Sequence, residues 1–181
     1  MAETVLAKDL MREGSTAYQA GRYPDAAAAF LQAARAFTTA GLKLDAAEAS
    51  NNASVALLKA GDAAGALRSA EGTDQVFAEA NDRSRQGMAV ANQAAALEDL
   101  GQLDEALNRY TSSAELLKQS GDKELRAIVL KSISGLQIRT GKQLQALASM
   151  DAALDNQKHL SLRERLLQKL LRLPMDMIRR R

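Results

Sequence analysis

The chain of 181 residues has no cysteine and no tryptophan, and it contains only two prolines and one histidine. Without cysteine it can form neither a disulfide nor a thiolate metal site. No stretch reaches the roughly 18 uncharged apolar residues that a membrane span needs. The first ten residues also lack the basic start and apolar run of a signal peptide. We therefore expect a soluble, cytoplasmic protein.

Residue patterns that support catalysis are also missing. The single histidine, His159, has no cysteine or acidic cluster arranged around it as in a metal site. The glycines do not form a phosphate-binding loop, and no serine or threonine has a histidine base within reach of any known pattern. The sequence therefore predicts a protein that is not an enzyme and that has no metal or cofactor.

Alanine and leucine dominate what is present, with 36 and 27 residues respectively. Both are strong helix formers because they lose little side-chain freedom in a helix. Because so many of the apolar residues are small, the composition predicts helices that pack closely against one another.

Turn-forming residues recur along the chain with a fixed period. Four glycines are spaced by 40 residues, and a second set lies midway between them: Gly21, Gly61, Gly101 and Gly141, then Gly41, Asn81 and Gly121, with Ser161 at the next place. Glycine and asparagine tolerate the left-handed backbone that ends many helices. The spacing predicts four helical hairpins, at residues 1–40, 41–80, 81–120 and 121–160, followed by a helix from residue 161.

Aligning the four repeats gives two columns of small residues. The first holds Gly14, Ser54, Ala94 and Ser134, and the second holds Ala26, Ala66, Ala106 and Ala146. Such columns indicate places where helix backbones approach closely. A third column, four residues after the second, holds Phe30, Ala70, Tyr110 and Met150, so repeat two lacks the bulky residue of the others.

This combination of columns resembles the tetratricopeptide repeat family. The usual repeat has 34 residues, and the period of 40 is similar to a long-repeat branch that includes kinesin light chains and the soluble attachment proteins that recruit the SNARE-disassembling ATPase. The resemblance covers residues 1–160 and implies an all-α, right-handed α-solenoid. It also implies an adaptor or scaffold for a protein or peptide, held in a concave groove that the first helices of the repeats line.

Family columns carried onto this sequence give candidate groove residues: Arg12, Asn51, Asn52, Asn92 and Lys131, with Tyr18, Leu58 and Ile138 as apolar contacts. Asparagine is a poor helix former, so three asparagines within predicted helices call for a reason. An amide offers both a donor and an acceptor, so a ladder of amides could pair with a peptide main chain. The alternative is that these are simply exposed or interhelical polar positions. The family's cationic clamp for a C-terminal carboxylate is not matched, because only Asn52 fits it.

The C-terminal segment, residues 161–181, is basic and amphipathic. From Lys158 to the end the net charge is +6, against −4 for residues 1–157. Ser161 and Glu164 predict a capping box, and Pro174 is expected to end the regular run of leucines that follows. We expect a helix that caps the last repeat, with Leu166, Leu170 and Leu173 packed on residues 142–158. A membrane-surface helix and a phosphate-contacting tail are the alternatives, although no aromatic residues suggest nucleic-acid binding.

Two functions thus remain open at the level of sequence. The first is an adaptor that binds an extended peptide or a partner helix in the groove. The second is an assembly element that acts through self-association or membrane docking of residues 161–181. We expect a monomer or weak dimer, protein partners, no nucleic acid, and membrane contact only through the C-terminal segment.

Overall fold

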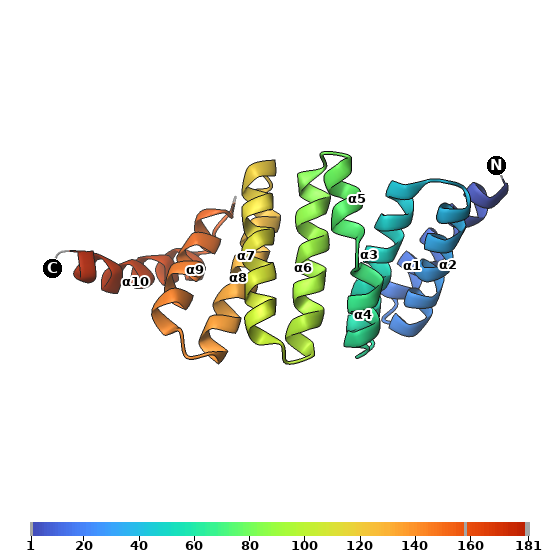
Figure 1. Cartoon of the computed structure of the whole chain (residues 1–181). Helices are drawn as coiled ribbons and strands as arrows, with labels where there is room; N and C mark the ends of the chain where they lie inside the picture. The colour runs from blue at the N-terminus through green and yellow to red at the C-terminus, as the bar shows by residue number, and fades with distance from the viewer. Residues whose placement is uncertain (1, 158, 180–181) are drawn as a thin grey trace.

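The protein is an elongated row of antiparallel helices, as a computed structural model shows for residues 2–157 and 159–179 (Figure 1). The helices are α1 (Ala2–Gln19), α2 (Tyr23–Thr39), α3 (Lys43–Lys59), α4 (Ala63–Ala70), α5 (Thr73–Glu79), α6 (Arg83–Asp99), α7 (Leu103–Ser120), α8 (Lys123–Arg139), α9 (Gln143–Asp155) and α10 (Leu162–Arg179). These residues contain no strand. The predicted all-α solenoid of helical hairpins is confirmed.

The turns between helices form where the periodic residues stand. The intra-repeat glycines at 21, 61, 101 and 141 have φ between 72° and 84°, and Asn81 has φ 57°. A positive φ reverses the chain after a helix, and glycine accepts it without the steric cost that a Cβ brings. At the helix starts, Pro24 lies in the first turn of α2, and Asp104 and Glu105 lie in the first turn of α7.

The small-residue columns form the closest contacts of the core. Ala26, Ala66, Ala106 and Ala146 are all buried, as are Gly14, Ser54, Ala94 and Ser134. An ideal Cβ added at Gly14 would lie 2.7 Å from the ring of Phe30, so no larger residue fits there without movement. Ser134 joins the two columns directly, because its hydroxyl donates to the carbonyl of Ala146 at 2.8 Å.

Repeat two differs from the prediction of one continuous second helix over residues 61–80. The segment is broken into α4 and α5, with Glu71 extended and Gly72 at φ 75°. Ala70, the small residue in the bulky column, is fully buried just before the break. Two hydrogen bonds to the carbonyl of Ala70 stabilise this break. Thr73 donates its hydroxyl at 2.7 Å, and the side-chain amide of Gln93 in α6 donates at 3.0 Å.

The C-terminal helix begins as predicted but ends later than predicted. The predicted capping box is present, since Glu164 accepts the backbone N–H of Ser161 at 2.9 Å and Ser161 accepts that of Glu164 at 3.3 Å. However, α10 continues through Pro174 to Arg179, although a proline removes the N–H of one helical hydrogen bond.

The C-terminal helix packs against α9, as predicted, but not through Leu166 and Leu170. Leu166 and Leu170 are exposed, whereas Leu171 is buried and α10 lies against α9. The side chain of Leu173 lies outside the described residues.

Candidate binding surface

The first helices of the hairpins, α1, α3, α6 and α8, share one face of the row, which we call the first-helix face. Two hollows open on it. The N-terminal hollow, of about 280 Å³, lies between α1 and α3 and is lined by Ser15, Tyr18, Gln19, Phe30, Asn52 and Val55. The C-terminal hollow, of about 180 Å³, lies between α6 and α8 and is lined by Met88, Ala91, Asn92, Ala95, Tyr110, Leu125, Ile128, Val129 and Ser132.

The two hollows occupy equivalent places two repeats apart. Phe30 of α2 lines one and Tyr110 of α7 lines the other, and these residues share the bulky column of the repeat. Asn52 and Ser132 are likewise equivalent. The linings differ in chemistry, because Ser15, Gln19 and Asn52 make the N-terminal hollow the more polar of the two. The C-terminal hollow is largely apolar, and Ile128 leaves 62% of its surface exposed there.

Aromatic contacts and ion pairs fix the walls of the hollows. Tyr18 packs edge-on against Tyr23 at the start of α2, with 5.3 Å between ring centroids. In the C-terminal half, Tyr110 donates to Glu98 of α6 at 3.1 Å, and Arg139 of α8 pairs with the same carboxylate at 2.5 Å. Burial raises the pKa of the Tyr110 phenol well above its ordinary value, and the negative charge of Glu98 adds to this effect. Tyr110 therefore stays a neutral donor throughout the physiological range.

The predicted groove residues divide between this face and other places. Tyr18 and Asn52 meet in the N-terminal hollow, and Asn92 lines the C-terminal one; both amides are half-buried. Leu58 is half-buried on α3, and Ile138 is exposed on α8.

Asn51 does not lie on an open surface. It is only 8% exposed, and its side-chain oxygen lies 3.1 Å from the hydroxyl of Thr73, whose proton it shares with the carbonyl of Ala70, which links α3 to α5. Because consecutive residues on a helix point about 100° apart, Asn51 and Asn52 face different neighbours. Asn51 is an interhelical polar position, the alternative to the ladder, and it lines neither hollow.

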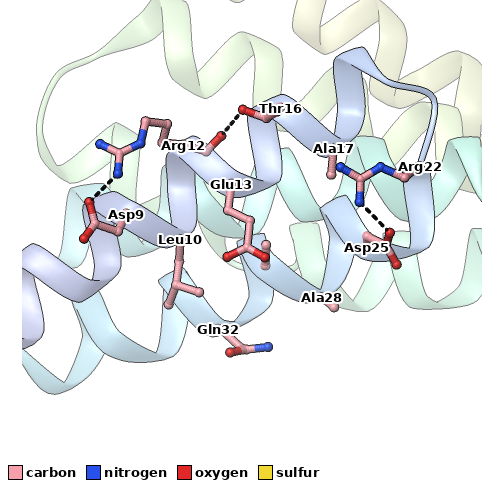
Figure 2. Close-up of a pocket in the computed structure, with 11 residues that line it drawn as sticks. Asp9, Leu10, Arg12, Glu13, Thr16, Ala17, Arg22, Asp25, Ala28 and Gln32 are labelled. Atoms are coloured by element: carbon pink, nitrogen blue, oxygen red, sulfur yellow. Dashed lines mark hydrogen bonds and ion pairs between the residues drawn. The ribbon is translucent and has the colours of Figure 1, made fainter.

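Arg12 lies in a third hollow, at the N-terminal end of the row between α1 and α2 (Figure 2). This hollow measures about 620 Å³. Arg12 pairs with Asp9 at 2.9 Å and Arg22 with Asp25 at 3.0 Å, and Figure 2 shows Glu13 between the two pairs. The equivalent residue Asn52 lines the N-terminal hollow instead, so these two members of the column lie in different hollows.

Lys131 is placed near the beginning of α10. The pKa of Glu164 is lowered mainly by the backbone N–H and the hydroxyl of Ser161, and the charge of Lys131 contributes as well. Lys131 shares its repeat column with Asn51, and both point toward the following elements of the row. Neither Asn51 nor Lys131 lines one of the two hollows on the first-helix face.

Within the described part of the chain, no group of three or more histidine, cysteine, aspartate or glutamate side chains could hold a metal ion. Over the same residues, no helix combines the length and apolar character required to cross a membrane.

Comparison with known proteins gives one family. Residues 3–172 match the family model described as "Soluble NSF attachment protein, SNAP". No curated protein matches the chain.

Proposed function

The chain belongs to the soluble NSF attachment protein family, and on that premise we propose that it is a non-catalytic adaptor that binds a partner protein on the first-helix face. A role in protein interaction is general to this helical family. The finer part of the proposal is that an extended segment or a helix of the partner lies across the N-terminal and C-terminal hollows.

The observation that carries the proposal is that each hollow has one half-buried asparagine among apolar side chains, Asn52 of α3 in the N-terminal hollow and Asn92 of α6 in the C-terminal one. Asn52 and Asn92 have amide groups with donors and acceptors that can pair with a main chain. Tyr18 and Ile128 offer apolar surface beside them. The difference in lining supports a partner segment with a polar end toward α1 and an apolar end toward α8. The family description makes an NSF-type ATPase the first partner to test.

The test uses the double variant Asn52→Ala and Asn92→Ala. Each hydrogen bond to a main chain contributes about 0.5–1.5 kcal/mol net, so the pair should weaken binding by about one to two factors of ten. A partner is captured with the wild-type protein, identified by mass spectrometry, and then measured by calorimetry. The matched control is Asn108→Ala, which removes an exposed asparagine from α7 on the second-helix side.

The expected result is weaker binding by the double variant alone, with an unchanged circular dichroism spectrum. Equal affinity of the double variant and the wild type would show that the first-helix amides do not contact the partner. An equal loss in the Asn108→Ala control would place the binding surface on the second helices instead.

A further inference from the structure

The apolar side of α10 has two edges with different surroundings. Leu171 is only 7% exposed and lies at the edge that packs against α9. Gln168 ties the same two helices together, since its amide donates to Asp155 at 2.6 Å. At the other edge, Leu162, Leu166 and Leu170 are 84%, 61% and 54% exposed. Residues four apart lie one above another on a helix, so these three leucines form one continuous strip.

Cationic side chains border the leucine strip. Arg163, Arg165 and Lys169 are all exposed, and their helical spacing places them beside the strip. The one acidic residue between positions 162 and 171 is Glu164, whose carboxylate is already bound to Ser161 at the helix start. The strip therefore presents apolar surface within a field of positive charge.

The leucine strip is accessible to a flat surface because α10 extends away from the other helices, and the first turn of α10 is stabilised from within. Figure 1 shows α10 extending away from the row of helices, at the opposite end from the N-terminus. The capping box fixes the first turn by hydrogen bonds within the helix itself. The helix therefore does not depend on a binding partner for its first turn, and less ordering is required on association.

We propose that α10 docks along an anionic membrane surface, with Leu162, Leu166 and Leu170 inserted at the boundary of the acyl chains. A strongly amphipathic helix with basic residues on its polar side is the form that lies in the plane of such an interface. The three exposed cations complement lipid phosphates and carboxylates, which attract basic residues near a membrane surface.

The positive charges beside the leucine strip argue against a second copy of the chain as its binding partner. Two α10 strips placed face to face would bring Arg163, Arg165 and Lys169 of each copy close to the same residues of the other. Like charges across an interface disfavour association. A single row of three leucines is also smaller than the area of a stable protein interface, whereas a lipid surface needs only a linear apolar edge.

The experiment measures co-sedimentation of the full chain with vesicles. One set contains phosphatidylcholine alone, and the other contains phosphatidylcholine mixed with phosphatidylserine. The variants are Leu166→Gln, the triple change of Leu162, Leu166 and Leu170 to glutamine, and Arg165→Gln with Lys169→Gln. The matched control is Leu144→Gln, because Leu144 of α9 is 66% exposed and lies outside the strip.

The expected result is binding to the phosphatidylserine vesicles that falls as salt is added, since exposed charges are screened. Leu166→Gln should weaken the partition by about tenfold and the triple variant by about a hundredfold or more. The double charge variant should lose the preference for phosphatidylserine, and Leu144→Gln should behave as the wild type.

Three outcomes would overturn the inference. The first is no binding to either vesicle set, and the second is equal binding by the triple variant and the Leu144→Gln control. The third is a concentration-dependent dimer in sedimentation velocity that the triple variant abolishes while vesicle binding is absent, since the strip would then join two copies. Circular dichroism of each variant checks that the helices remain folded. The assay does not use the first-helix face, so its result is independent of the adaptor proposal.

Discussion

Glycines within the helices of this chain meet two opposite environments. At Gly14 an added Cβ would lie within 2.7 Å of the buried ring of Phe30, whereas at Gly135 in α8 nothing lies within 4 Å. Neither glycine has a positive φ. A substitution to alanine therefore adds the same methyl group to a helix in both cases, and only the neighbouring side chains differ.

We expect Gly14→Ala to lower the free energy of unfolding by about 1–3 kcal/mol, because overpacking forces the Phe30 ring or the backbone to shift. Gly135→Ala should raise it by about 0.5–1 kcal/mol, because alanine is the better helix former. Urea denaturation of both variants measures the difference. If both substitutions stabilise the chain, α1 and α2 do not approach as closely at Gly14 as the structure shows.

At the scale of the element, the break between α4 and α5 gives one of two adjacent asparagines in α3 a buried hydrogen-bond partner. The turn at Gly72 brings Thr73 beside Asn51 of α3, and the hydrogen bond between them is buried. Asn52, the next residue, faces the N-terminal hollow and has no hydrogen-bond requirement of this kind from the fold. Two adjacent asparagines therefore differ in what they stabilise.

Asn51→Ala should lower the free energy of unfolding by about 0.5–1.5 kcal/mol, the net value of a hydrogen bond within a protein. Asn52→Ala should leave it unchanged or raise it by a few tenths of a kcal/mol, owing to the higher helix propensity of alanine. Thermal unfolding followed by circular dichroism compares the two. A loss of stability in Asn52→Ala equal to that in Asn51→Ala would mean that both amides are structural.

The sequence predicted the helices, the turns and the small columns because each depends on local residue preferences that recur four times. It did not predict the break at Gly72. Only repeat two has an alanine in the bulky column with a glycine two residues later, so no other repeat indicates what this combination does. The break also supplies the buried partner of Asn51, because Thr73 begins the short helix that follows it. For α10, the leucine pattern defined an apolar side but could not tell which edge of it packs against α9.

The whole molecule is held together by contacts between successive hairpins. Ion pairs and hydrogen bonds that cross repeats join residues about one period apart, such as Arg85 with Glu48 and Arg139 with Glu98. In such a row the stability is close to a sum of terms for each unit and for each interface between neighbours. A change at one end should therefore have little effect on the other end.

Hydrogen exchange of Gly14→Ala tests this independence. We expect faster amide exchange in α1, α2 and α3 than in the wild type, since local opening there needs less free energy. The rates in α8 and α9 should remain those of the wild type. Uniformly faster exchange along the whole chain would show that the solenoid unfolds as one cooperative unit.

The same linear order bears on how the chain is made by the ribosome. A domain that depends on contacts between its two ends must wait for its last residues before it can fold, and α1–α2 has no such dependence in this row. Synthesis adds roughly 5–20 residues per second, so each new hairpin can dock on the finished ones within seconds of its emergence. The exposed edge of a growing solenoid is therefore never wider than one hairpin, which limits the apolar surface that a nascent chain presents to its neighbours.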